Sequence, residues 1–457
     1  MYDVIIIGAG PAGIFAALKL SSRTDLKILL LDMGPDIGER RCPSRDRSVV
    51  CARCESCSLA SGWGGAGAFS DGKITLSPEI GGWLSDLLGK KRVEALISEV
   101  DKIWLRFGSP TKVYGDDQDA VELISRKATL ANLELKTNKL RHLGTDLCRK
   151  ILADMRAHIN GSVEVRTKTR VSKIMVKDGS VSGVQLKDGT TLESRVVLAA
   201  PGRIGAEWLS SESRRLGIGL AQNPVDIGVR VEVPAEVLSP LTDVLYEPKL
   251  KYVSKRFDDS VRTFCVNPYG EVITEYYDDV ITVNGHSFER KKTTNTNFAI
   301  LVSTAFTEPF KEPIAYGKYV ARLANLLSGG IVVQRLGDLV QGRRSTVDRM
   351  KRSIVTPTLR NATPGDLSFI LPYRILSNIV EMLKAIDKLT PGVFSKHTLL
   401  YGVEVKFYSS RVDTNEKLET SVKNLFVAGD GAGLTRGLSQ AAACGLAAAE
   451  NISERLS

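Results

Sequence analysis

The first 32 residues alternate between apolar runs, a glycine-rich turn and an amphipathic stretch. Val4–Ile7 is one apolar run, and a second ends at Asp32. Between them, the segment that begins at Pro11 carries Ile14, Phe15 and Leu18 at helical spacing. The pattern predicts a strand, a glycine turn, a helix and a second strand over residues 2–32, which is typical of an α/β unit.

The pattern of hydrophobic and polar positions changes twice over the next 170 or so residues. Residues 33–80 are dense in Gly, Pro, Cys and Ser and show little periodicity, which predicts loops. Apolar positions at helical spacing predict helices over 84–108 and Gly144–His158. Strands are predicted at Val163–Val171, Ile174–Val176, Val181–Leu186 and Val196–Ala200.

From about Pro224 to Phe407 the pattern changes again. Alternating segments predict an antiparallel sheet, and they lie at Asp226–Val233, Val261–Asn267, Glu271–Tyr276 and Ala299–Thr304. Helices are predicted over 315–328 and 372–389, the second with Pro372 in its first turn. Residues 424–457 return to a strand, a glycine turn and an alanine-rich helix. We therefore expect a discontinuous Rossmann-type α/β domain, formed by residues 1–215 and 401–457, with an inserted α+β substrate domain at 216–400.

Composition and charge narrow the class of protein. With 43% hydrophobic and 25% charged residues, the 457-residue chain is expected to be globular, and no apolar run reaches the ~18–20 residues that span a bilayer. The N-terminus resembles no signal peptide, which predicts a cytoplasmic protein. The net charge of +10 indicates either a solvated basic surface or a patch for an acidic partner or substrate. Because the basic residues are dispersed, nucleic acid is not an expected partner.

The glycine turn after the first strand has the spacing of a dinucleotide-binding motif. Gly8 permits the tight turn, Gly10 lets a diphosphate approach the backbone, and Gly13 lets the helix pack closely on the strand. Asp32 follows at the spacing of an acidic residue that binds an adenosine ribose. The cofactor-binding residues expected here are Gly8, Gly10, Pro11, Ala12, Gly13 and Asp32.

The C-terminal motif points to one particular dinucleotide. Residues 424–433, NLFVAGDGAG, resemble the second FAD signature of glutathione-reductase-type flavoproteins, in which the aspartate, here Asp430, holds the ribityl chain or a phosphate. The residues Val196–Gly202 resemble the strand and glycine that these proteins use nearby, and 62–73, GWGGAGAFSDGK, resembles their flavin loop. The resemblance implies FAD as cofactor and adds Gly64, Gly65, Ala66, Val171, Gly202, Gly429, Asp430, Gly437, Leu438 and Ser439 to its expected binding residues.

Taken together, these motifs resemble those of poorly characterised bacterial and archaeal FAD-dependent dehydrogenases, also called NAD(P)/FAD-dependent oxidoreductases. The resemblance covers nearly the whole chain and is most specific at GWGGAGAFSDGK and at VNGHSF, residues 283–288. Candidates for a catalytic or substrate-binding role are Lys73, Asn284, His286 and Arg411. We expect the inserted domain to cover the reactive face of the flavin and to bring Asn284 and His286 near it.

Four of the seven cysteines cluster before the flavin loop. Cys42, Cys51, Cys54 and Cys57 fall within sixteen residues with the spacing C-x8-C-x2-C-x2-C. Four thiolates at this spacing suit a [4Fe–4S] cluster or a structural zinc ion. Redox-active thiols beside the flavin and plain cysteines are the remaining alternatives.

The sequence thus predicts an FAD-dependent oxidoreductase that moves hydride or electrons between FAD and a small organic substrate. The cysteine cluster is a candidate electron relay, and NAD(P)H is a candidate donor although no second GxGxxG motif occurs. The alternative is an electron-transfer flavoprotein whose basic surface docks an acidic protein carrier such as ferredoxin.

Overall fold

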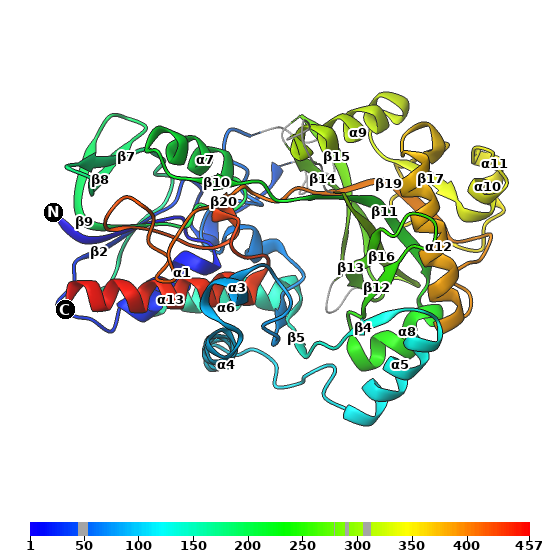
Figure 1. Cartoon of the computed structure of the whole chain (residues 1–457), viewed down its shortest axis with the longest axis horizontal. Coiled ribbons are helices and arrows are strands. Elements are labelled where there is room, and N and C mark those ends of the chain that lie inside the picture. The colour runs from blue at the N-terminus through cyan, green and yellow to red at the C-terminus, as the bar shows by residue number, and fades with distance from the viewer. Residues whose placement is uncertain (44–53, 278, 288–291, 305–311) are drawn as a thin grey trace. The chain divides into compact units, whose positions relative to one another are not determined.

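The chain folds into two compact units, each with its own core (Figure 1). The computed structural model describes residues 1–43, 54–277, 279–287, 292–304 and 312–457. Unit 1 contains residues 1–112, 141–223 and 409–457, and unit 2 contains residues 113–140 and 224–408. The unit borders therefore differ from the domain borders at 215 and 400 that the sequence suggested.

The largest difference is the segment 113–140, which lies within the first domain that the sequence predicts. Its strand β4 (Glu134–Lys136) pairs with β12 (Lys249–Val253) of unit 2. Its helix α5 (Gln118–Leu130) adds Ile124 and Ala128 to the hydrophobic core of that unit. The segment carries no motif, and only the pairing partner far along the chain reveals where it belongs.

A parallel sheet forms the centre of unit 1. Its strands lie in the order β6-β2-β1-β9, and β21 also pairs with β9, all in parallel register. Their bounds are β1 Tyr2–Ile7, β2 Ile28–Leu31, β6 Glu164–Arg166, β9 Thr191–Ala199 and β21 Leu425–Val427. The near-continuous apolar sequences of β1, β2 and β21 fit strands that are covered on both faces.

The sheet continues in an antiparallel meander, β9-β8-β7, with β8 at Ser180–Leu186 and β7 at Val171–Lys177. The range 163–171, predicted as a single strand, instead contains all of β6 and the first residue of β7, separated by residues 167–170. Smaller elements of unit 1 are β3 Lys73–Thr75, β10 Leu220–Ala221, β20 Arg411–Val412, η1 Ile37–Glu39, η2 Gly65–Phe69 and η4 Asp430–Ala432, and β5 Leu140–His142 lies at its border.

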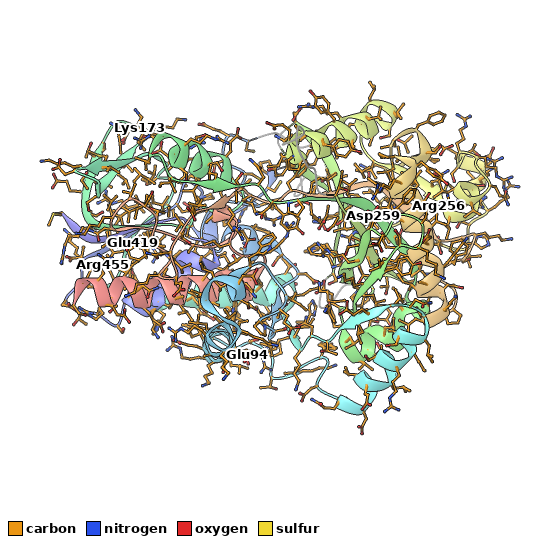
Figure 2. The ribbon with its side chains drawn as sticks, viewed as in Figure 1. Glu94, Lys173, Arg256, Asp259, Glu419 and Arg455 are labelled. Carbon is orange, nitrogen blue, oxygen red and sulfur yellow. The ribbon has the colours of Figure 1, made fainter. Side chains whose placement is uncertain are left out.

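Two helices from opposite ends of the sequence pack together against this sheet. They are α1 (Pro11–Leu20) and α13 (Leu438–Leu456), and both are rich in alanine and glycine. A Cβ added at Gly445 would lie 2.0 Å from the Ala12 carbonyl oxygen, so this close approach requires glycine. The far end of α13 is tied down by an ion pair between Arg455 and Glu419, 2.6 Å apart (Figure 2).

The remaining helices of unit 1 are α3 Leu84–Leu88, α4 Lys90–Arg106, α6 Gly144–His158 and α7 Ala206–Arg215. The helix predicted over 84–108 is therefore two helices. It breaks at Gly89, whose φ of 81° ends α3 in a conformation that favours glycine.

Unit 2 is built on an eight-stranded sheet in the order β18-β17-β19-β11-β16-β13-β12-β4. The central strand β11 pairs in antiparallel fashion with β16 and with β19, as the alternating sequences predicted. Bounds not given above are β11 Val225–Pro234, β13 Ser260–Asn267, β16 Asn295–Thr304, β17 Val332–Arg335, β18 Thr363–Pro364 and β19 Leu399–Lys406. A separate hairpin joins β14 (Glu271–Tyr277) to β15 (Val280–His286).

The two faces of this sheet differ in polarity. Alternate residues of β11, such as Val229 and Val231, join a hydrophobic core with the helices, whereas Arg230 and Glu232 face the other way and are fully buried. The helices are α8 Ala235–Leu245, α9 Pro313–Ser328, α10 Leu336–Val340, α11 Val347–Lys351 and α12 Tyr373–Leu389, with η3 at Leu367–Phe369. Pro372 is the residue before α12 rather than a member of its first turn. No helix among the described residues is long and apolar enough to cross a membrane.

Candidate cofactor site

The turn between β1 and α1 is shaped by two glycines that admit no side chain. A Cβ at Gly8 would lie 2.2 Å from the Ala200 carbonyl oxygen, and a Cβ at Gly13 would lie 1.9 Å from the Gly8 carbonyl oxygen. Gly10, the residue before the helix, caps it with no side chain. The first N–H groups of α1 are therefore left to meet a ligand, and the helix dipole favours an anion such as a diphosphate there.

Asp32 joins three loops at the carboxyl end of the sheet. Its carboxylate accepts hydrogen bonds from the backbone N–H groups of Ala9 at 2.7 Å, Gly34 at 2.8 Å and Gly62 at 2.7 Å. Burial raises the pKa of this carboxyl group, and the three N–H donors oppose the shift. A carboxylate has about four acceptor positions, so one remains for a ribose hydroxyl.

The loop that resembles a flavin loop bridges α1 and α13. Gly64 N–H donates to the Ala9 carbonyl oxygen at 2.7 Å, and the backbone then turns into the short helix η2. A Cβ at Gly65 would lie 2.9 Å from the Cα atom of Gly10, and one at Gly67 would lie 2.6 Å from Leu438 Cδ2. Ala66 lies between these two contacts, so the loop runs directly across both helix starts.

The C-terminal motif lies beside the flavin loop, because Leu438 contacts Gly67. Asp430 begins the turn η4 after β21 and accepts a hydrogen bond from Thr435 Oγ1 at 2.9 Å. Burial raises the pKa of its carboxyl group. Gly437 and Leu438 then open α13, where Ser439 Oγ and Gln440 Oε1 are buried and have no hydrogen-bond partner within the described part of the chain.

This arrangement fits FAD. A Cβ at Gly10, Gly202 or Gly437 would meet no atom within 4 Å, so three separate segments leave space where the backbone is bare. The orphaned Ser439 hydroxyl supplies a polar group that a ligand can satisfy, since buried hydroxyls are normally hydrogen-bonded. The residues that would hold FAD are thus the two helix starts, Asp32 and Asp430.

Arg40 belongs to this region although the sequence analysis did not single it out. Its guanidinium is buried and donates from Nε to the Ser58 carbonyl oxygen at 2.9 Å and from Nη1 to the Trp63 carbonyl oxygen at 2.7 Å. Burial lowers its pKa to about 10, against the attraction of Asp32. Nη2 has no partner among the described residues, which makes Arg40 a further candidate for holding a phosphate. No sequence spacing distinguishes it from its neighbour Arg41.

Lys73 lies in a compact ion cluster at the end of the flavin loop. Its Nζ atom is 3.0 Å from Asp71 Oδ2, and His142 Nε2 is 2.8 Å from Asp71 Oδ1. All three side chains are largely buried. Asp71 thereby orients an ammonium group and an imidazole together, a grouping that the separate sequence motifs could not reveal.

The other catalytic candidates lie on β15 of unit 2 and on β20 of unit 1. Asn284, in β15, accepts from Arg230 Nη2 at 3.0 Å and donates to Glu275 Oε2 at 3.0 Å. His286, in the same strand, is buried in unit 2. Arg411 starts β20 in unit 1 with an exposed side chain, while its backbone approaches Gly433. Val171 is the buried first residue of β7.

The cysteine cluster falls partly outside the described residues, which do not include Cys51. Cys42, Cys54 and Cys57 are free thiols, the last two exposed. Within the described ranges, no three His, Cys, Asp or Glu side chains gather in a way that could hold a metal ion. Because Cys51 lies outside the described residues, a metal site formed by all four clustered cysteines stays a prediction. Cys444 is packed in α13, where burial raises the pKa of its thiol to about 12.

Three family descriptions match parts of the chain. Residues 224–407 match "FAD-dependent protein, C-terminal domain-like", residues 6–53 match a NAD(P)-binding Rossmann-like domain, and residues 359–457 match glucose inhibited division protein A. These matches cover both the Rossmann turn of unit 1 and most of unit 2.

The individual proteins that match this chain share a low sequence identity with it. An uncharacterized protein of Clostridium beijerinckii is 27% identical over 477 residues, which cover 99% of this chain and 80% of that protein. A digeranylgeranylglycerophospholipid reductase of Methanosarcina mazei is 26% identical over 230 residues, 50% of this chain and 42% of that protein. Among solved structures, a glycine oxidase of Bacillus cereus aligns with 12% identity and a TM-score of 0.42, covering 100% of this chain and 98% of the other. A likeness at that score does not bear on the chemistry.

Proposed function

We propose that this chain, which matches an FAD-dependent protein family over residues 224–407 and a Rossmann-like domain over residues 6–53, transfers hydride or electrons between bound FAD and a small organic substrate. When bound, FAD supplies the two-electron chemistry. The observation that carries the proposal is the bare backbone at Gly10, Gly202 and Gly437, together with the orphaned Ser439 hydroxyl beside it.

Each segment of unit 1 has a proposed part in holding the cofactor. The uncapped N–H groups of α1 bind the diphosphate, supported by the unpartnered Nη2 of Arg40. Asp32 uses its remaining acceptor position for the ribose, and Asp430 binds the ribityl chain or a phosphate. The N-terminus of α13 and Ser439 stabilise negative charge on the ring system.

Lys73 is the residue that we propose for catalysis within unit 1. Asp71 fixes its ammonium group, and the same carboxylate fixes His142, so the cluster can hold a proton beside the flavin loop. Asn284, His286 and Arg411 remain candidates for contacts with the substrate. For Asn284 the hydrogen bonds to Arg230 and Glu275 already provide a structural role.

The test begins with the cofactor of the purified protein. Mass analysis of the released cofactor should give FAD, and FMN or no flavin after reconstitution would reject the proposal. Anaerobic reduction with NADH, NADPH and reduced ferredoxin then identifies the class of donor. Rapid reduction by NADH or NADPH supports a nicotinamide donor, whereas reduction by ferredoxin alone would favour the electron-transfer alternative.

Iron and labile sulfide should be measured in the same anaerobic sample. We propose the cluster of Cys42, Cys51, Cys54 and Cys57 as a candidate electron relay. Stoichiometric iron and sulfide, lost together in serine variants of these four cysteines, would support the relay, and background levels of both would reject it.

A further inference from the structure

Exposed apolar side chains concentrate in one stretch of unit 2. Of the fifteen large hydrophobic residues that are exposed within the described ranges, nine lie between residues 319 and 373. Several protrude strongly: Leu326 is 80% exposed, Ile354 73% and Phe369 71%. Exposed apolar side chains scattered singly are ordinary, but a concentration of this kind marks an interaction surface.

Basic residues concentrate in the same stretch. Residues 335–360 contain seven Lys or Arg and two Asp, and so carry a formal charge of +5 out of the +10 of the whole chain. One of the two carboxylates, Asp338, is fully buried, so Asp348 is the exposed acid of this segment. The segment contains no aromatic residue.

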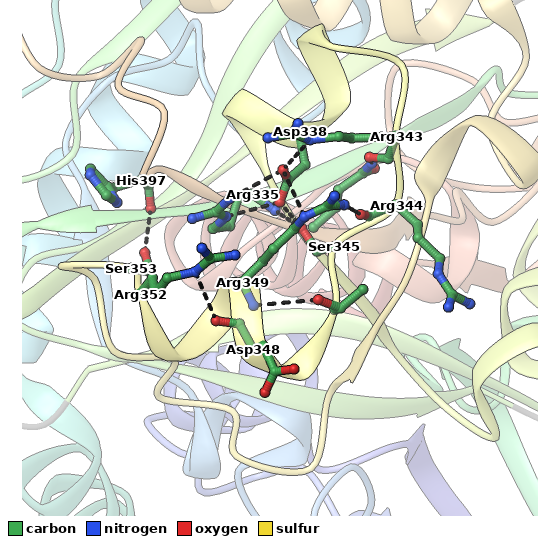
Figure 3. Close-up of polar contacts among 12 residues, drawn as sticks. Arg335, Asp338, Arg343, Arg344, Ser345, Asp348, Arg349, Arg352, Ser353 and His397 are labelled. Carbon is green, nitrogen blue, oxygen red and sulfur yellow. Dashed lines mark hydrogen bonds and ion pairs between the residues drawn. The ribbon is translucent and has the colours of Figure 1, made fainter.

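The buried carboxylate of Asp338 lies within ion-pair distance of three arginines of this segment (Figure 3). It accepts hydrogen bonds from Arg335 at 2.9 Å and from Arg343 at 2.9 Å, while Ser345 Oγ donates to it at 2.8 Å. Arg349 lies 4.0 Å from the same carboxylate and donates to the Arg344 carbonyl oxygen at 2.7 Å. The loop between α10 and α11 is thus held by hydrogen bonds to Asp338, while the Arg344 side chain extends away from that carboxylate (Figure 3).

Hydrogen bonds connect the elements that carry these residues. Thr363 Oγ1, in β18, donates to the Ser328 carbonyl oxygen at the end of α9, 2.9 Å away. Ser345 N–H donates to the Gly365 carbonyl oxygen at 2.9 Å, which ties the loop before α11 to the segment that leads into η3. These contacts link the end of α9 and the α10–α11 loop to the chain around β18, the strand at one edge of the unit 2 sheet. We call this region the apolar–basic edge, and its exposed members are Leu326, Leu327, Val340, Val347, Ile354, Phe369, Arg343, Arg344, Lys351, Arg352 and Arg360.

We propose that the apolar–basic edge binds the surface of an anionic phospholipid bilayer. Leucine, isoleucine and phenylalanine side chains that protrude by more than two thirds of their surface can enter the boundary between headgroups and acyl chains. The surrounding Arg and Lys side chains then meet the lipid phosphates. This attachment is peripheral and does not depend on the flavin.

The same observations favour a bilayer over other anionic partners. Binding of single-stranded nucleic acid uses aromatic stacking, and residues 335–360 offer no aromatic side chain for it. An acidic protein partner pairs charges of both signs around a close-fitting apolar centre. Here the apolar side chains protrude individually from four elements, and a fluid surface accommodates such projections without shape complementarity.

The experiment is co-sedimentation of the full-length protein with lipid vesicles. We expect binding to vesicles of phosphatidylglycerol and phosphatidylcholine in equal parts, weakening as salt is added, and none to phosphatidylcholine alone. The variant Arg344→Glu, Lys351→Glu, Arg352→Glu should bind at least roughly 100-fold more weakly, since one basic residue near an anionic surface is worth about fivefold. The variant Leu326→Ser, Ile354→Ser, Phe369→Ser should also lose most binding.

Matched controls change exposed residues of the same kinds elsewhere. Lys91→Glu, Lys102→Glu, Lys127→Glu makes the same change in net charge, and Leu123→Ser, Leu130→Ser, Val253→Ser removes as many exposed apolar side chains. Both controls should bind like the wild type, and each variant is first shown to keep the wild-type unfolding midpoint. A charge variant that fails this check is replaced by the alanine set at the same three positions.

Three results would overturn the proposal. The first is wild-type protein that does not bind the anionic vesicles. The second is an equal loss of binding in the control variants, which would show that only total charge matters. The third is equally tight binding of soluble polyglutamate with no effect of the three serine substitutions, which would indicate an acidic protein as the partner.

Discussion

The start of α13 in unit 1 and the Arg230 side chain on the sheet of unit 2 differ in whether their buried polar atoms have hydrogen-bond partners. At α13, Ser439 and Gln440 keep buried oxygens without partners in the described structure, and Gly437 leaves open space beside them. On the sheet face, the guanidinium of Arg230 is fully buried, and each of its nitrogens has an acceptor. Its carboxylate partner, Glu404, lies 2.7 Å away.

The comparison separates a helix start that leaves buried oxygens unpartnered beside open space from a guanidinium whose hydrogen bonds are all made within the chain. Burying a hydroxyl or a charge without a partner costs free energy, and at the start of α13 the open space at Gly437 leaves room for a ligand that would satisfy it. The Arg230 network satisfies every guanidinium nitrogen and leaves one buried donor, Asn297 Nδ2, without a partner among the described residues. We therefore infer that it specifies how the hairpin β14–β15 packs on the sheet, through Asn284 and the bare backbone of Gly285, where a Cβ would lie 2.6 Å from Arg230 Nη1.

The largest expected effect comes from breaking the buried Arg230–Glu404 ion pair. Glu404→Ala would leave Arg230 and Lys406 buried without their shared carboxylate, and we expect the free energy of unfolding to fall by about 3–5 kcal/mol. Urea unfolding followed by far-UV circular dichroism measures the change. All four tryptophans lie in unit 1, so their fluorescence monitors that unit separately.

The double variant Arg230→Met, Glu404→Leu is the control for that result. Because it removes both charges, most of the stability should return. A loss as large as that of Glu404→Ala would show that the ion pair contributes through specific hydrogen bonds rather than through charge balance.

A smaller effect on stability is expected at Asp338. Its carboxylate also accepts several hydrogen bonds, but it lies near the surface. Hydrogen bonds from Arg335, Ser345 and Arg343 outweigh burial and lower its pKa to about 2. A carboxyl group whose pKa is lower in the folded state stabilises the protein above its unfolded value of 3.8, and this stability is lost as the pH falls through about 2. The shift corresponds to about 2 kcal/mol.

Asp338→Asn should therefore be less stable than wild type at pH 7 by about that amount, and the difference should shrink towards pH 2. Thermal unfolding across this range gives the comparison. A difference that stays constant with pH would mean that Asp338 acts through packing alone.

The smallest effect is expected at the start of α13 in unit 1. Ser439→Ala should leave the stability of the cofactor-free protein unchanged, because its hydroxyl makes no hydrogen bond there among the described residues. Its affinity for FAD should fall about fivefold to tenfold, the value of one hydrogen bond. Ser109→Ala removes another buried, unpartnered hydroxyl of unit 1 and serves as the control in the same FAD titration. Equal affinities of the two variants would contradict the role of Ser439.

The sequence was informative where a local pattern determines the structure. The glycine turn at residues 8–13 and the start of α13 follow from their own spacing, and both lie where the motifs predicted. The antiparallel strands of unit 2 followed from alternation. The residues 113–140 could not be assigned, because their membership in unit 2 depends on the pairing of β4 with β12 more than a hundred residues later.

For the same reason, the sequence does not predict which side chains bond to one another. Asp32 was expected to bind a ribose, but its ties to Ala9, Gly34 and Gly62 depend on loops that meet only in the folded chain. Arg40 and the Asp71–Lys73–His142 cluster likewise join distant segments. The cysteine spacing predicts a metal or redox site that stays a prediction, because Cys51 lies outside the described residues.

The central claim is that the bare backbone of unit 1 binds FAD, and the FAD content of purified Gly10→Ala tests it most directly. Gly10 has φ of −79° and ψ of −177°, which alanine adopts freely, and the added Cβ meets no protein atom within 4 Å. The variant should therefore fold as stably as the wild type. Gly330→Ala, also in open space with no positive φ, is the matched control in unit 2. The account predicts that Gly10→Ala loses at least about nine tenths of its FAD, because a side chain there blocks the diphosphate, while Gly330→Ala retains full occupancy. Full FAD occupancy in Gly10→Ala would contradict the account.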